Sequence, residues 1–137
     1  MLTHGARVGR LACQRDYILN SLLQKALNQD QRGLAPGDGN VYQPVGLMAE
    51  RMLAALPEKV LEEYRFLADA EVEPLLDSPG AWKDPEVLRE VVRRFYLSSY
   101  GARAAYRLAC LNLDQRKFGR ARRLLTRIRK YPADDPI

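Results

Sequence analysis

The chain has 137 residues and a net charge of +5, with 47% hydrophobic and 28% charged residues. A chain of this length suits one domain, and its hydrophobic content argues against wholesale disorder. No apolar run approaches the roughly 20 residues that a membrane-spanning helix needs. The first residues include Arg7 and Arg10 without an apolar stretch after them, so they do not predict a signal peptide.

Charge is distributed unevenly along the chain. Residues 1–40 carry a net charge of +2, residues 41–100 one of −4, and residues 101–137 one of +7. The sequence therefore predicts an acidic middle and a strongly basic final third.

Apolar residues recur at helical spacing, so we predict an all-α fold. A first helix carries Ile18 and Leu22 on one face. The loop PGDGNVYQPV follows it. Val41 and Tyr42 can pair there as a short extended piece, but we predict no sheet. A second helix is expected over residues 46–56.

Proline marks the boundaries of the next helices. Pro57 is expected to end the second helix and to open a third, because proline is tolerated in a first helical turn. A separate short helix is expected at residues 71–76, before the breaker sequence DSPG. Asp84 followed by Pro85 predicts a helix start, with a carboxylate cap and a proline at the first helical position.

Two more helices complete the predicted fold. Ser98 or Ser99 is expected to cap the first, which ends at a turn over residues 114–117. The second is expected to stop at Tyr131-Pro132, because a residue before proline disfavours helix. Its core face, expected to pack on the preceding helix, consists of Phe118, Ala121, Leu125 and Ile128.

Internal similarity recurs at a spacing of 36 residues, near the 34 residues of tetratricopeptide repeats. Three apolar pairs share this spacing: Leu88 with Leu124, Val92 with Ile128, and Phe95 with Tyr131.

The string AAYRLACLNLDQRKFGRARRLLTRIRKYP resembles one tetratricopeptide repeat. Three residues depart from the family's pattern: Ala105 stands where it often has Trp, Asn112 where it often has Tyr, and Arg116 in place of the usual turn Gly. The resemblance implies a short α-solenoid of antiparallel helix hairpins, tetratricopeptide-like in the C-terminal half. The repeat-packing residues that it implies are Leu108, Ala109, Phe118, Ala121, Tyr131 and Pro132.

One continuous domain is expected, with three parts. These are a flexible segment over residues 1–15, helical hairpins over residues 16–80, and tetratricopeptide-like helices over residues 84–132.

The order of segments also resembles the helical N-terminal region of large planctomycete proteins that continue into a β-propeller of the quinone-binding type. The segments that carry this resemblance are LLQKALNQD, GDGNVYQPV, ERMLAALPEKVLEEYR and LREVVRRFYLSSYGARAAYRLA. The resemblance implies that the chain is the helical part of a larger protein, and it suggests the bacterial cell envelope.

No set of residues predicts catalysis, a cofactor or a metal site. The only histidine, His4, is near the N-terminus, so no Ser-His-Asp set can be built. Cys13 and Cys110 are too far apart in sequence for a metal pattern or a disulfide framework. We interpret one acidic cluster as a solvated helix face rather than as a general acid–base pair. It consists of Glu58, Glu62, Glu63, Glu71 and Glu73.

A basic stripe is the strongest candidate for binding, because its four residues are spaced 3, 4 and 3 along the last helix. We predict a non-catalytic interaction or scaffolding module that meets a protein partner or an adjacent domain through this stripe. The stripe is expected to point away from the preceding helix, and it consists of Arg120, Arg123, Arg127 and Lys130.

Two alternatives remain for this stripe. It can contact nucleic-acid phosphates, or it can be the polar outer face that a terminal repeat needs. Proteins that bind single strands usually interleave aromatic and basic residues. We interpret Tyr106 and Phe118 as packing residues, which weakens the nucleic-acid alternative.

Overall fold

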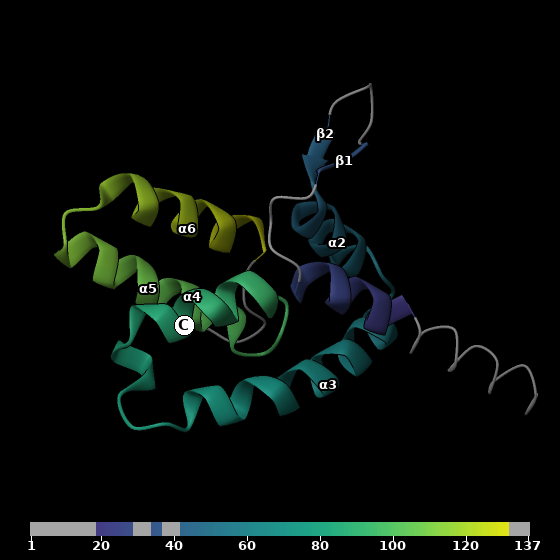
Figure 1. Cartoon of the computed structure of the whole chain (residues 1–137), viewed down its shortest axis with the longest axis horizontal. Helices are drawn as coiled ribbons and strands as arrows, with labels where there is room; N and C mark the ends of the chain where they lie inside the picture. Colours follow the sequence, from purple (N-terminus) through teal and green to yellow (C-terminus); the bar gives the residue numbers. More distant parts are fainter. Residues whose placement is uncertain (1–18, 29–33, 37–41, 132–137) are drawn as a thin grey trace, which may run out of the picture. The chain divides into compact units, whose positions relative to one another are not determined.

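The computed structural model of the protein describes residues 19–28, 34–36 and 42–131 (Figure 1). The predictions for His4, Cys13, Pro132 and the segment 1–15 lie outside these residues. The chain forms two compact units, Met1–Leu61 and Glu62–Ile137. This division does not test the predicted domain boundaries, which stay a prediction.

Six α-helices lie in the described part of the chain, which confirms the predicted helical class. The exception to this helical class is a short antiparallel ribbon, in which β1 and β2 have three residues each. The elements are a helix over residues 19–28, β1 (Leu34–Pro36), β2 (Tyr42–Pro44), α2 (Val45–Ala54), α3 (Glu58–Leu76), the 3-10 helix η2 (Ala81–Lys83), α4 (Pro85–Arg94), α5 (Gly101–Asp114) and α6 (Phe118–Lys130).

The ribbon belongs to the first unit, and its register explains why it forms. Ala35 lies opposite Gln43, and each of them precedes a proline. A residue before proline is biased toward extended backbone, so both strands are extended at their centre. Pro44 then serves as the N-cap residue of α2. The sequence prediction of no sheet was therefore wrong at this ribbon.

α3 continues through Pro74 as one helix, so the separate helix predicted at residues 71–76 is wrong. Pro74 lacks the N–H that would complete the helical ladder. Packing nevertheless extends across it, because Tyr64, Ala68, Val72 and Leu76 recur every four residues on one face and all are buried. The helix begins directly after Pro57, as the sequence predicts.

The start of α4 confirms the predicted cap. The Asp84 carboxylate accepts a hydrogen bond of 2.9 Å from the backbone N–H of Glu86, and Pro85 is the first helical residue. A side chain that satisfies a free N–H of a first turn stabilises a helix by about 1 kcal/mol. The inward face of α4 is fully buried and consists of Leu88, Val91 and Val92.

The predicted serine cap of α5 is wrong. α5 begins at Gly101 without a side-chain cap. The Ser98 hydroxyl donates instead to the carbonyl of Phe95 at 2.6 Å. Ser99 donates to Asp69 of α3 through both its backbone N–H and its hydroxyl. The serines therefore fix the loop that joins α4 to α5.

The turn between α5 and α6 ends α5 in a Schellman motif. The Lys117 N–H donates to the carbonyl of Asn112 at 2.7 Å, and the Arg116 N–H donates to that of Leu113 at 2.9 Å. Arg116 itself has a φ of 58°, in the left-handed region that glycine adopts most easily. This is the position at which the resemblance to tetratricopeptide repeats leads one to expect a turn glycine.

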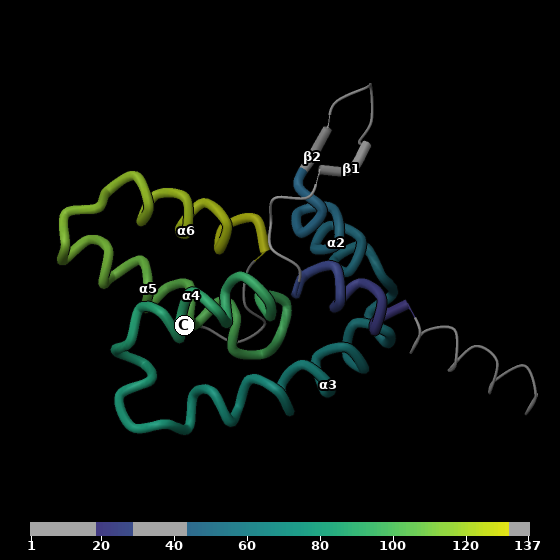
Figure 2. Tube along the Cα trace, in the orientation of Figure 1, coloured from purple at the N-terminus to yellow at the C-terminus, as the bar shows by residue number. Residues whose placement is uncertain are grey.

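In the second unit, α5 packs against α4 on one side and against α6 on the other, while η2 contacts both α4 and α5. Figure 2 shows α5 and α6 running antiparallel beside each other. Ala109 of α5 and Ala121 of α6 are each 1% exposed. This burial agrees with a packing role for both residues.

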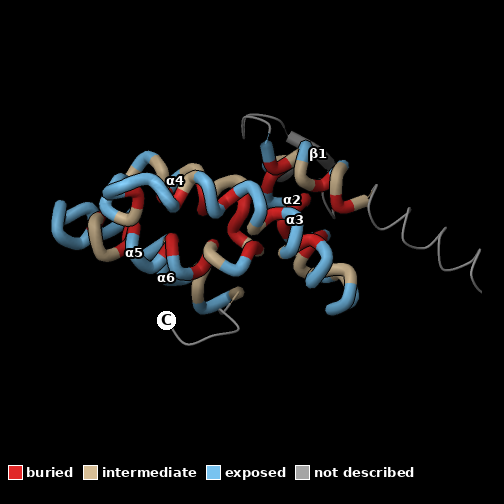
Figure 3. Tube along the Cα trace, turned by 90° about the horizontal axis from the view of Figure 1, so that it is seen from below, coloured by how far each residue is buried: buried red, intermediate tan, exposed pale blue. Residues whose placement is uncertain are grey.

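The orientation of α6 differs from the predicted one. Ala121 is buried and Ile128 is half-buried, but Phe118 is 63% exposed and Leu125 is 41% exposed. Figure 3 accordingly shows most of α6 as exposed or intermediate. Leu124 is half-buried instead, and it lines one pocket with Leu108 and Asn112 of α5.

Candidate partner-binding site

Four arginines from two helices converge on one pocket of about 400 Å³ in the second unit. Arg89 comes from α4, and the other three come from α6. Two leucines and one asparagine complete the lining, and no acidic residue among residues 19–28, 34–36 and 42–131 belongs to it. We name this pocket the arginine groove, and its residues are Arg89, Leu108, Asn112, Arg120, Arg123, Leu124 and Arg127.

Two of these cations make no hydrogen bond or ion pair within the described residues, namely Arg120 and Arg123. Arg89 forms an ion pair with Glu86, one helical turn before it. Both partners of that pair are well exposed, so the pair contributes little to stability and Arg89 can exchange it for a ligand. The groove therefore offers at least three guanidinium groups to a bound anion.

Arg127 is held in place by Tyr96, which sequence reasoning missed. Its guanidinium carbon lies 4.2 Å from the centre of the Tyr96 ring, a distance at which the ring attracts a cation. Tyr96 is buried, and its hydroxyl donates to the carbonyl of Tyr131 at 3.1 Å. No pattern in the sequence indicates this role, because only packing brings Tyr96 beside Arg127.

Three of the four residues of the predicted basic stripe therefore belong to the arginine groove. Arg120, Arg123 and Arg127 lie together in the groove, whereas Lys130 lies outside it with its ammonium 5.1 Å from the Tyr131 ring. Arg120 and Arg123 are exposed, and the groove that they line also includes Leu108 and Asn112 of α5, so their expected direction away from that helix stays a prediction. Arg89 and Asn112 were not predicted, because only tertiary packing brings them to this pocket.

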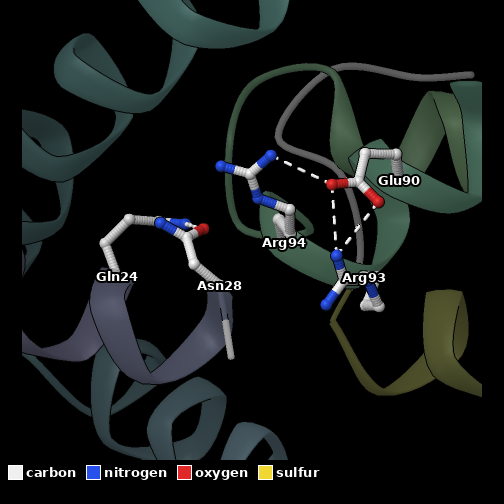
Figure 4. Close-up of polar contacts among 5 residues, drawn as sticks. All are labelled: Gln24, Asn28, Glu90, Arg93 and Arg94. Atoms are coloured by element: carbon white, nitrogen blue, oxygen red, sulfur yellow. Dashed lines mark hydrogen bonds and ion pairs between the residues drawn. The ribbon is translucent and has the colours of Figure 1, made fainter. Parts of the chain in front are cut away.

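Two cations of α4, Arg93 and Arg94, are paired with an acidic residue of the same helix. Glu90 accepts hydrogen bonds from Arg93 at 3.0 and 3.1 Å and from Arg94 at 2.9 Å (Figure 4). Partial burial raises the pKa of Glu90, but the two guanidinium groups together outweigh it and hold this pKa below its usual range. These arginines are therefore compensated within their own helix.

Figure 4 also shows an amide pair on the helix over residues 19–28. The Gln24 side chain donates to that of Asn28 at 2.9 Å. This pair lies one helical turn apart on an exposed surface, where such a bond supports the helix locally.

A second pocket of about 340 Å³ has apolar walls and two arginines. Phe118 and Leu125 contribute exposed side chains to it. Tyr106 of α5 is also 47% exposed, so the interpretation of Tyr106 and Phe118 as packing residues was wrong. The lining residues are Leu113, Phe118, Ala121, Arg122, Leu125, Thr126 and Arg129.

The acidic cluster of α3 is exposed, as its interpretation as a solvated face requires. Glu73 accepts a hydrogen bond of 3.0 Å from the Tyr100 hydroxyl, and this bond raises the pKa of Tyr100. Among residues 19–28, 34–36 and 42–131, no group of three or more His, Cys, Asp or Glu side chains is arranged to hold a metal ion. In the same residues, no helix has the length and apolar character needed to span a membrane.

Comparisons with protein-family models, with curated proteins and with solved structures find no match to this chain. The arginine groove is therefore interpreted from its own geometry and charge.

Proposed function

We propose that the chain is a non-catalytic interaction module that holds an acidic segment of a partner protein in the arginine groove. One observation carries this proposal. Four guanidinium groups line a single pocket, and two of them, those of Arg120 and Arg123, make no hydrogen bond or ion pair within the part of the chain that the structure describes. A carboxylate-bearing partner would supply counter-charges for Arg120 and Arg123.

The arginine side chain is well suited to binding a carboxylate. Its planar guanidinium presents donors in a fork that matches both oxygens of a carboxylate. Arg120 and Arg123 lie three residues apart on α6 and make no competing bond within the described part of the chain. Two acidic side chains of an extended segment can therefore be held at once.

The remaining lining favours a peptide over a small inorganic anion. Leu108 and Leu124 offer apolar contact area, and Asn112 offers an amide that both donates and accepts hydrogen bonds. An extended acidic segment has apolar side chains and backbone groups for these contacts. The high positive charge of residues 101–137 would also speed the approach of an acidic partner.

The resemblance to tetratricopeptide repeats supports the same proposal. Stacked helix pairs of this kind form concave surfaces that hold peptides or partner domains. Under this proposal the chain is the helical part of a larger protein, and the groove joins it to a neighbouring domain or to a separate protein.

Nucleic-acid binding is the alternative, and the exposure of two aromatic side chains favours it. Tyr106 and Phe118 are both accessible, on helices that carry several arginines. Bases of a single strand stack on such side chains while cations contact the phosphates. The two functions differ in their dependence on salt and on the chemistry of the ligand.

Fluorescence anisotropy with three labelled ligands separates these functions. The ligands are a peptide of alternating Glu and Leu, the same peptide with Gln for Glu, and a single-stranded oligonucleotide of mixed sequence. The proposal predicts that the Glu peptide binds and that the Gln peptide does not. Tighter binding of the oligonucleotide, with an affinity that falls steeply with salt, would favour the alternative.

A further inference from the structure

We propose that copies of this chain associate head to tail, with the exposed face of α3 in one copy docked on the exposed face of α6 in another. The α6 face is defined by Leu113, Phe118, Arg122, Leu125 and Arg129. The α3 face is defined by Glu62, Glu63, Phe66, Leu67, Ala70 and Glu71.

The α6 face is an apolar surface with a basic rim. Phe118, Leu125 and Leu113 are all exposed and line the same pocket of about 340 Å³. Arg122 and Arg129 line it as well. The spacings along α6 from Phe118 to Arg122, Leu125 and Arg129 are 4, 3 and 4 residues, so these side chains share one face of the helix. α6 contains six cations and no acidic residue, so nothing on this helix balances the rim.

The α3 face is an apolar surface with an acidic rim. Phe66 is 79% exposed, and Leu67 beside it is also exposed. Glu62 and Glu63 lie one turn before Phe66, and Glu71 lies one turn after Leu67, so on a helix these residues are neighbours. Residues 62–76 contain five acidic residues and one basic residue, Arg65, which donates to the carbonyl of Leu97.

The two faces complement each other in charge, and an exposed apolar side chain of one matches the apolar pocket of the other. The exposed aromatic ring of Phe66 is a side chain that an apolar pocket of this volume can receive. The acidic rim around it then meets Arg122 and Arg129. Both faces are exposed in a single copy, so neither is covered by the other within one chain. A second copy is therefore the occupant whose chemistry matches both faces.

This association is heterologous, because two different faces meet. Each contact leaves one free α3 face and one free α6 face, so growth continues unless a ring closes. The contact uses none of the residues of the arginine groove. It consequently stands or falls independently of the proposed peptide binding.

Sedimentation velocity over a range of protein concentrations tests the inference. The parent chain is expected to grow in average mass as concentration rises at low salt, and to dissociate at about 0.5 M salt, where exposed charges are screened. The variant Glu62→Arg/Glu63→Arg and the variant Arg122→Glu/Arg129→Glu are each expected to remain monomeric, because each makes its two faces alike in charge.

Mixing the two charge-reversed variants is the decisive step. The basic α3 face of one then meets the acidic α6 face of the other, so the mixture is expected to associate again. The groove variant Arg120→Glu/Arg123→Glu is the control, and it is expected to associate like the parent. A mixture that stays monomeric, or a parent that is monomeric at every concentration, would overturn the inference.

A further variant tests the inference without a charge reversal, so its result does not depend on whether a reversal disturbs folding. Phe66→Ala changes only an exposed side chain, and circular dichroism will verify that its helix content is unchanged. It is expected to weaken self-association at least tenfold, since the ring supplies most of the apolar contact. Association as tight as that of the parent would also overturn the inference.

Discussion

The Tyr96 hydroxyl donates a hydrogen bond of 3.1 Å to the backbone carbonyl of Tyr131, 35 residues further along the chain. This bond ties the end of α6 to the loop between α4 and α5. The two rings also lie close, with centres 6.2 Å apart. Because the Tyr96 ring also carries Arg127, the same side chain joins the stability of the helix pair to the geometry of the arginine groove.

Tyr96→Phe tests that link. The change removes the hydroxyl and leaves the Tyr131 carbonyl without this donor, so we expect the free energy of unfolding to fall by about 1 kcal/mol. Urea unfolding followed by circular dichroism measures the change. Tyr106→Phe is the matched control, since the Tyr106 side chain is exposed, and it is expected to leave the stability unchanged. Equal effects of both changes would contradict the assigned role.

Gly101→Ala should strongly destabilise the fold. A Cβ placed on Gly101 would overlap the backbone carbonyl of Tyr96, so the loop between α4 and α5 must move to accept it. Overpacking of this kind costs about 1–3 kcal/mol. A thermal melt of the purified variant measures the loss.

Gly119→Ala is the matched control for that substitution. A Cβ at Gly119 meets nothing within 4 Å, and the residue lies inside α6. Replacing a helical glycine with alanine stabilises a helix by about 0.5–1 kcal/mol. The two substitutions should therefore act in opposite directions, and a lower melting temperature for Gly119→Ala would show that the surroundings of α6 differ from those described.

Arg116→Gly should stabilise the protein. Arg116 has a φ of 58°, which is strained for a residue with a Cβ and free for glycine. We expect a gain of about 1 kcal/mol in urea unfolding. Gln115→Gly, one residue earlier, is the comparison, because Gln115 has a φ of −87° and should lose stability. A loss of stability in Arg116→Gly would mean that the Schellman turn is not formed as described.

We expect the contribution of Glu90 to the free energy of unfolding to be lost at acidic pH. Its pKa is held below its usual range in the folded chain by Arg93 and Arg94, despite partial burial. An acid with a lowered folded pKa stabilises the fold above its unfolded pKa of about 4.3, and this contribution is lost as pH falls through the folded value. The Glu90 side chain is 38% exposed, so solvent screening keeps the contribution below about 1 kcal/mol.

Urea unfolding of the parent and of Glu90→Gln at pH 6 and pH 3 measures this contribution. The parent should be the more stable of the two at pH 6, and the difference should shrink at pH 3. An unchanged difference between the two pH values would contradict the assigned role of the Glu90 network.

The sequence predicts the helices well where local signals are strong. The cap at Asp84 and the breaks at Pro57 and at residues 114–117 follow from local chemistry, and the structure has all of them. Pro74 is a weaker signal, because buried residues on both sides of it keep α3 continuous. The strand pair was missed because two proline-biased segments pair only once the chain folds back.

The face of α6 shows why the site was predicted only in part. Spacing along that helix lets Ala121 and Ile128 pack together either with Phe118 and Leu125 or with Leu124. The 36-residue alignment pairs Leu124 with Leu88, and in the structure Leu124 is half-buried whereas Phe118 and Leu125 are exposed. Arg89 and Tyr96 join the site only through packing, so no sequence pattern predicts them.

The central claim, that the arginine groove binds an acidic segment, is tested most directly by one pair of variants with the same change in charge. Arg120→Glu/Arg123→Glu alters the groove, whereas Arg122→Glu/Arg129→Glu alters the same helix outside it. Binding of the labelled Glu peptide is measured by anisotropy at protein concentrations where the parent is monomeric. The groove variant is expected to bind about a hundredfold more weakly than the parent, and the other variant within about threefold of it. Equal weakening in both variants would contradict the claim, because it would show that the peptide responds to net charge and not to the groove.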